Sequence, residues 1–137
     1  MTEAIDTTPE ATSDEALLKV DDLVVEFRTN DGIVRAVNGL SYRLDAGETV
    51  AILGESGSGK SVSAQAVMGI IDSPPGFVTG GSIEYRGKDI LKMGANDQRK
   101  IRANNIAMVF QDALTALNPV FTVGWQMSEL FRKHRGM

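Results

Sequence analysis

The stretch that decides the fold is Gly54-Glu55-Ser56-Gly57-Ser58-Gly59-Lys60-Ser61. It matches in full the pattern G-x-x-x-x-G-K-[ST] of a phosphate-binding loop, or P-loop. An apolar run at residues 49–53 leads into it and predicts a strand. A helix beginning near Lys60 is predicted by apolar residues at helical spacing, namely Ala64, Val67, Met68 and Ile71. Strand, glycine-rich loop and helix form the context that this motif requires.

The residue types of the loop suit a polyphosphate. Glycines 54, 57 and 59 let the backbone curl so that successive N–H groups point toward one centre. The helix that follows adds the positive end of its dipole and its unpaired first-turn N–H groups. Lys60 supplies a positive charge for the β- and γ-phosphates, and the Ser61 hydroxyl is placed to ligate Mg²⁺. The alternative is a glycine-rich turn without a ligand, which the matching flanks disfavour.

Composition places the chain among soluble globular proteins. Of its 137 residues, 42% are apolar and 23% are charged. The acidic excess lies in residues 1–16, which carry five carboxylates and no Lys or Arg and are predicted to be a disordered tail. Residues 17–137 are nearly neutral, which gives no electrostatic case for nucleic acid as a partner. The absence of cysteine suits a reducing cytosol, and no apolar run is long enough to span a membrane.

Further elements are predicted on both sides of the P-loop. Two strands, at residues 18–27 and 33–44, flank an Asp-Gly turn signal and predict a β-hairpin before the loop. After the helix come a strand at 81–85 and a short helix at 96–102, with Asn96 or Asp97 as its cap. A continuous apolar run at residues 106–110 predicts a strand covered on both faces. An amphipathic helix is expected from about Val123.

These landmarks resemble the ATP-binding subunit of an ATP-binding-cassette (ABC) transporter, in its dipeptide and oligopeptide importer branch. The resemblance runs from about Leu18 to the C-terminus. It is carried by AVNGLSY at residues 36–42, GGSIEYRGKD at 80–89, IAMVFQD at 106–112 and LNPVFTVG at 117–124. It implies an α/β P-loop NTPase fold: an antiparallel β-subdomain and the start of a RecA-like core, with the sheet incomplete. Residues 17–137 would form this partial nucleotide-binding domain.

The resemblance also implies roles for single residues. Residues 54–61 would bind ATP, and Phe27 sits where the family places an aromatic that stacks on adenine; the alternative is an ordinary core residue of its strand. Gln111 matches the Q-loop glutamine, which would reach Mg²⁺ and the attacking water; the alternative is a surface glutamine at a strand end. Lys60 and Gln111 are therefore the catalytic candidates, and Ser61 and Gln111 the metal-binding ones. Trp125 is expected to pack in the core, and the alternative is a residue that contacts a partner.

The implied partners are transmembrane permease subunits, a second ATPase subunit in a homo- or heterodimer and, indirectly, a peptide-binding protein. The implied location is the cytoplasmic face of the cell membrane. The 137 residues lack an LSGGQ-type signature, an apolar strand ending in Asp-Glu and a switch histidine, since His134 lies in a basic cluster. We therefore expect the N-terminal part of a longer subunit, poorly stable and not hydrolytic alone.

Two other functions remain open at this stage. The chain could be a truncated nucleotide-binding or regulatory module that never hydrolyses ATP. It could also be another P-loop enzyme, such as a small-molecule kinase. The antiparallel strands before the P-loop and the Phe110-Gln111-Asp112 string argue against a kinase, which would transfer phosphate to an acceptor other than water.

Overall fold

The computed structural model describes residues 16–111 and 117–135. The predicted disordered tail, apart from its last residue, lies outside these ranges. The elements follow one another along the chain in the order β1 (Leu18–Thr29), β2 (Gly32–Leu44), α1 (Lys60–Met68), β3 (Gly76–Tyr85), β4 (Lys88–Asp89), the 3-10 helix η1 (Ile90–Lys92), α2 (Ala95–Asn104) and α3 (Val123–Arg135). None of the described helices is both long and apolar enough to cross a membrane.

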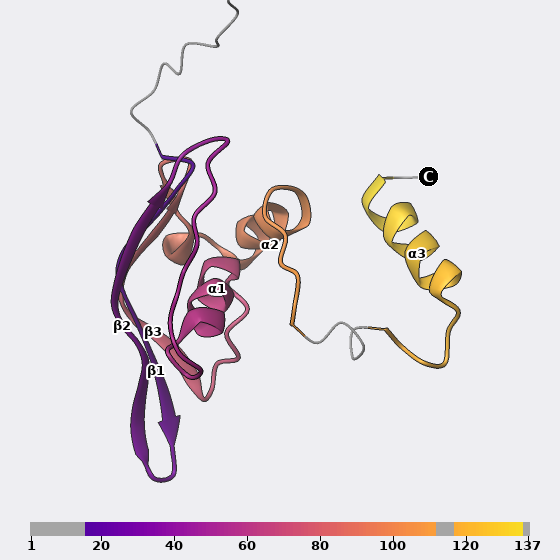
Figure 1. The fold of residues 1–137 in the computed structure, drawn as a ribbon. Coiled ribbons are helices and arrows are strands. Elements are labelled where there is room, and N and C mark those ends of the chain that lie inside the picture. Colours follow the sequence, from indigo (N-terminus) through magenta and orange to yellow (C-terminus); the bar gives the residue numbers. More distant parts are fainter. Residues whose placement is uncertain (1–15, 112–116, 136–137) are drawn as a thin grey trace, which may run out of the picture.

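The four strands form one antiparallel sheet in the order β2-β1-β3-β4. The predicted hairpin is present, and Thr29 pairs with Gly32 across a two-residue turn. The Thr29 hydroxyl donates a hydrogen bond to the Gly32 carbonyl oxygen at 2.9 Å, which ties the two ends of the turn together. Figure 1 shows β1 and β2 as a long ribbon that extends beyond the rest of the sheet.

A β-bulge interrupts β1 where the pairing register shifts against both of its neighbours. Asp22 has a positive φ of 46° there, and its N–H donates a hydrogen bond to the Ser41 hydroxyl at 2.8 Å. On the other side, a Cβ added to Gly81 would overlap the carbonyl oxygens of Asp21 and Asp22. The bulge therefore depends on a glycine in the neighbouring strand, because only a residue without a side chain fits against its backbone.

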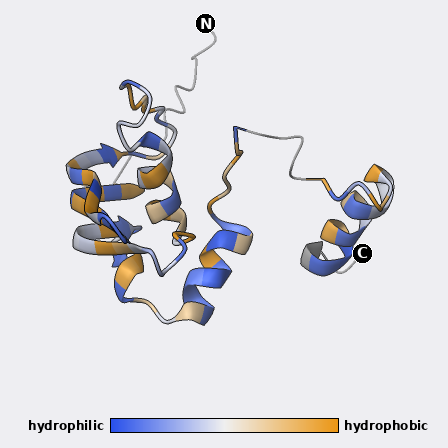
Figure 2. Cartoon of the chain, turned by 90° about the horizontal axis from the view of Figure 1, so that it is seen from below, coloured by the Kyte–Doolittle hydropathy of each residue, from blue (hydrophilic) through white to orange (hydrophobic). Residues whose placement is uncertain are grey.

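The core lies between one face of the sheet and α1. Val20, Leu23 and Val25 of β1 are fully buried: the bulge adds one residue between Val20 and Leu23, and the period of two expected for a strand with one buried face resumes after it. The cluster also contains Val37 of β2, Ile83 of β3, Ile90 of η1, and Ala66 and Val67 of α1. Helix α1 contacts both β1 and β2 (Figure 1). Hydrophobic and hydrophilic residues alternate along the strands in Figure 2. This packing holds the N-terminus of α1 at a defined place beside the sheet.

The strands predicted at residues 49–53 and 106–110 are wrong for this structure, because neither segment pairs with another described strand. Leu53 is 90% and Val109 is 93% exposed, although Ile106 is half-buried against the core. A strand is defined by its hydrogen-bonded ladder, and an apolar sequence alone cannot supply the neighbouring backbone. The predicted sheet is therefore realised only in its antiparallel part.

Helix ends agree only in part with the sequence patterns. The N-cap of α2 is Gly94, and neither Asn96 nor Asp97 caps it, because both lie inside the helix. Helix α3 begins at Val123, as predicted. The N–H of Trp125 donates to the Thr122 hydroxyl at 3.3 Å, which is one of the two hydrogen bonds of a capping box; the other would need a glutamate or glutamine at position 125. Trp125 was expected in the core, but it is 47% exposed and stacks on Phe121 with ring centroids 4.4 Å apart.

Candidate functional site

The P-loop curves tightly between residues 54 and 61. Gly57 and Gly59 have positive φ angles of 80° and 88°, a conformation that favours glycine. The Ser58 N–H donates to the Glu55 carbonyl oxygen at 3.2 Å and closes the turn. Gly59 is the N-cap of α1, and it has no side chain with which to cap the helix. The first-turn N–H groups of α1 thus face the mouth of the loop, which is the arrangement that binds anions at helix N-termini.

The loop also fits closely against β2. A Cβ added to Gly59 would overlap the carbonyl oxygen of Ala36, whereas a Cβ added to Gly57 would have no atom within 4 Å. The two glycines therefore differ: Gly59 lets the loop approach the strand, and Gly57 lies where the space around the loop is open. A glycine-rich loop with open space beside the first-turn N–H groups of a helix is suited to a polyphosphate.

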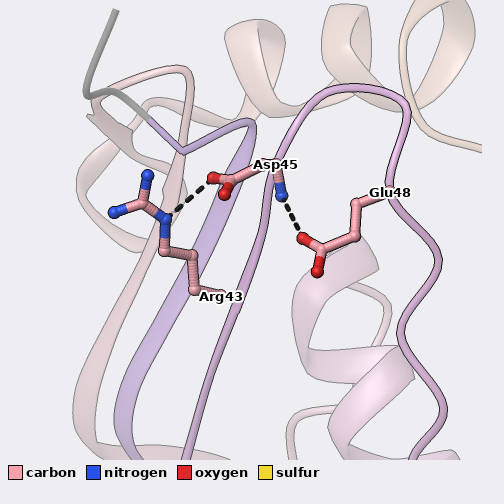
Figure 3. Close-up of polar contacts among 3 residues, drawn as sticks. All are labelled: Arg43, Asp45 and Glu48. Carbon is pink, nitrogen blue, oxygen red and sulfur yellow. Dashed lines mark hydrogen bonds and ion pairs between the residues drawn. The ribbon is translucent and has the colours of Figure 1, made fainter.

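The turn that leads from β2 toward the P-loop is held by three short-range contacts. The Arg43 Nε donates to the Asp45 carboxylate at 2.8 Å, and the Asp45 N–H donates to the Glu48 carboxylate at 2.9 Å (Figure 3). The Glu48 N–H donates in return to the Asp45 carbonyl oxygen at 3.2 Å. This reciprocal pair, with Gly47 at φ 77°, reverses the chain so that residues 49–53 enter the P-loop from the β2 side.

Lys60 spans the P-loop from its end to its beginning. Its ammonium group donates to the Gly54 carbonyl oxygen at 2.7 Å, to the Glu55 carbonyl oxygen at 2.6 Å and to the Ser58 hydroxyl at 3.2 Å. A lysine ammonium has three donors, so these contacts use all of them. The charge therefore lies inside the curve of the loop. Neutral oxygens bind a cation less strongly than a phosphate oxygen does, so a phosphate at this position would displace one of them from the ammonium group.

Gln111 and the P-loop line the same pocket, which has a volume of about 380 Å³. Ala36 of β2 and residues 56–62 form the rest of its lining. The structure thus places Ser61 and Gln111, the two residues predicted to bind metal, at one pocket although they are 50 positions apart. The described polar groups at this pocket are hydroxyls, an ammonium, an amide side chain and backbone N–H groups. Such groups position phosphates and a divalent cation.

A second pocket of about 500 Å³ lies on the β2 side of the same loop. It is lined by residues 35–40 of β2, by Ile52 and Leu53, and by residues 57–60 and Ser63. Phe27 lines neither of these two pockets: it is half-buried on β1, packed against the core and paired with Gly76 of β3. The adenine-stacking role predicted for Phe27 stays a prediction.

Two residues that matter for the loop were missed in the sequence. Ala36 supplies the backbone against which Gly59 packs, and nothing in its residue type marks that role. Ser63 is fully buried, and its hydroxyl donates to the Lys60 carbonyl oxygen at 2.7 Å. A serine three residues into an otherwise apolar helix face was a detectable signal, since a buried hydroxyl there can bond back to the preceding turn.

Known proteins resemble this chain over most of its length. The family model described as ABC transporter matches residues 37–134. The oligopeptide transport ATP-binding protein OppD of Bacillus subtilis (strain 168) is 47% identical over 118 residues, which cover 86% of this chain and 33% of OppD. The dipeptide transport ATP-binding protein DppD of Escherichia coli (strain K12) is 46% identical over 121 residues, which cover 88% of this chain and 37% of DppD. The chain therefore spans about a third of the length of these curated relatives.

Among solved structures, cbiO1 from Clostridium perfringens, part of the ABC transporter complex cbiONQ, is similar with a TM-score of 0.51 and 30% identity. The similarity covers 66% of this chain and 32% of cbiO1. The predicted α/β fold of an ABC nucleotide-binding domain, with an antiparallel β-subdomain and an incomplete sheet, is thereby confirmed. Because the matching residues make up well over half of the chain and include the whole P-loop, the chain belongs to the ABC transporter family.

Proposed function

We propose that the chain binds Mg·ATP at the P-loop pocket and is the nucleotide-binding part of an ATPase subunit that drives import of dipeptides or oligopeptides. The observation that carries the proposal is the meeting of residues 56–61 and Gln111 at one pocket. The curved loop supports the proposal, because Gly57 and Gly59 have positive φ angles of 80° and 88° and a Cβ added to Gly57 would have no atom within 4 Å. The names of the relatives support the peptide class.

Each site residue has a defined task in this scheme. The N–H groups of residues 57–61 hold the phosphate oxygens, and Lys60 exchanges a contact with Gly54 or Glu55 for one with the β- and γ-phosphates. Ser61 and Gln111 contribute oxygens to the magnesium ion, which draws electron density from the phosphates when it is bound. Gln111 also orients the attacking water, so Lys60 and Gln111 are the residues that act in catalysis. Phe27 stacks on the adenine ring.

The assembly follows from the same proposal. The subunit works at the cytoplasmic face of the cell membrane with permease subunits, a second ATPase subunit and, indirectly, a peptide-binding protein. Under this proposal, the chain hydrolyses ATP only when it is assembled with these partners. A chain that bound Mg·ATP normally but released no phosphate with permease and ATPase partners present would instead be a nucleotide-binding module, the alternative function.

Equilibrium binding of ATP tests the site. Replacing Lys60 by alanine removes a charge-assisted contact worth about 1.5–3 kcal/mol, so affinity should fall about 10- to 100-fold. The matched control is Lys19→Ala, which removes an exposed cation that pairs with Asp21 on β1, away from the pocket. Equal affinity of the two variants would place the phosphates elsewhere.

The metal ligands can be separated from the phosphate cradle. Ser61→Ala and Gln111→Ala should leave binding of ATP in EDTA unchanged, because their proposed task is to hold the metal. Both should reduce the gain in affinity that Mg²⁺ gives to the unmodified chain. A Gln111→Ala variant with the full magnesium-dependent gain would remove Gln111 from the metal site.

A further inference from the structure

A pocket of about 440 Å³ lies between the β3–β4 hairpin and α2. We call it the hairpin–α2 pocket. It shares no lining residue with the P-loop pocket. Three half-buried side chains, Tyr85, Met93 and Ile101, form its apolar surface. Its volume falls in the range of about 300–1,000 Å³ that is usual for small-molecule sites.

The exposed rim of the hairpin–α2 pocket is mainly positive. Arg86, Lys88 and Lys100 line it with a single carboxylate, Asp97. Lys100 is neutralised by Asp97 at 3.2 Å, but Arg86 and Lys88 form no ion pair with any other residue in the described ranges. Two uncompensated cations beside an apolar surface are complementary to an anion that carries an apolar group.

The walls of the pocket are fixed by specific contacts. Gln98 of α2 donates to the Ile90 carbonyl oxygen at 2.9 Å and to the Met93 carbonyl oxygen at 3.3 Å, which ties α2 to η1. On the opposite wall, the Arg86 N–H donates to the Leu17 carbonyl oxygen at 3.0 Å and anchors the hairpin turn to the start of β1. The pocket therefore exists without rearrangement, which lowers the cost of binding.

Arg86 holds an unfavourable backbone conformation at the edge of this pocket. It has φ 48° and is followed by Gly87 at φ 71°, as in a two-residue turn that prefers Asn or Gly at both positions. Its guanidinium carbon lies 5.5 Å from the centre of the Tyr85 ring. The turn thus places a cation over the aromatic surface of the pocket.

We propose that the hairpin–α2 pocket binds a small aromatic anion. The ring packs on Tyr85, Met93 and Ile101, and the carboxylate or phosphate contacts Arg86 and Lys88. This site is separate from the nucleotide site in its residues and in its chemistry: it offers an apolar surface and two side-chain cations in place of a ring of backbone N–H groups.

NMR titration of the isotope-labelled chain tests the proposal. The probes are benzoate and phenyl phosphate, which distinguish a carboxylate from a phosphate ligand, and benzyl alcohol as the uncharged counterpart. We expect saturable shifts in the amide signals of residues 85–88, 93 and 101 with at least one of the two anions. Benzyl alcohol should bind at least about tenfold more weakly, because it lacks the charge-assisted contacts.

Variants assign the binding to the two cations. Arg86→Asn with Lys88→Gln should weaken binding about tenfold or more while keeping a residue that the turn favours at position 86. The matched control, Lys19→Gln with Arg99→Gln, removes the same charge from outside the pocket and should leave the affinity unchanged. Shifts confined to the P-loop, equal weakening in both double variants, or no saturable shift at millimolar concentrations of either anion would each overturn the proposal.

Discussion

Alanine at Gly57 and at Gly59 should have different consequences, although the two glycines share nearly the same backbone conformation. Their φ angles are 80° and 88°, so an alanine at either position pays the left-handed penalty of about 1–2 kcal/mol. Only at Gly59 would the new Cβ also overlap the Ala36 carbonyl oxygen. That overlap forces the loop or β2 to move, which costs a further ~1–3 kcal/mol.

We therefore expect Gly57→Ala to lower the free energy of unfolding by about 1–2 kcal/mol and Gly59→Ala by about 2–5 kcal/mol. Urea unfolding followed by far-ultraviolet circular dichroism measures both, since the only tryptophan lies in α3, outside the sheet and its core. ATP affinity should fall further for Gly59→Ala, because the N-terminus of α1 would shift with it. Equal losses of stability in the two variants would show that β2 does not press on the loop, and would refute the reasoning.

Three other predictions concern contacts around the core. At the C-terminus of α1, Arg102 donates to the carbonyl oxygens of residues 68 and 69 at 3.1 and 2.9 Å. Arg102→Ala should therefore lower the free energy of unfolding by about 1–3 kcal/mol, whereas the control Arg99→Ala should change it little. Equal urea midpoints for the two variants would contradict this prediction. Arg86→Gly should raise the free energy of unfolding by about 1 kcal/mol by relieving the positive φ, and a lower thermal midpoint would argue against strain there. Although its burial opposes the shift, the Lys92 hydrogen bond at 2.9 Å, the Leu91 N–H and the Lys92 charge hold the pKa of Asp89 below its ordinary value. This stabilisation is present at neutral pH and is lost as the pH falls through the lowered pKa, so acid titration should find the stability gap to Asp89→Asn closing below about pH 4.

The sequence by itself determined the family and the position of the glycine-rich P-loop at the start of α1. The P-loop pattern depends on glycine, lysine and serine at fixed local spacing, and such short-range requirements can be recognised directly in the sequence. The β1–β2 hairpin is local in the same way. The end of α1 was not predicted correctly, because the apolar spacing extended the helix to Ile71, whereas α1 ends at Met68. Gly69, at φ 61°, ends that helix with its N–H on the Ala66 carbonyl oxygen, while the Ile70 N–H bonds to the Gln65 carbonyl oxygen.

Only the tertiary structure decided which distant residues share a surface. Gln111 comes to the same pocket as Ser61, and Ala36 of β2 sets how closely the loop can approach the sheet, because packing joins parts of the chain that no sequence period links. The same reason explains the failed strands at residues 49–53 and 106–110: their apolar composition was read correctly, but a strand exists only where another backbone supplies its hydrogen bonds.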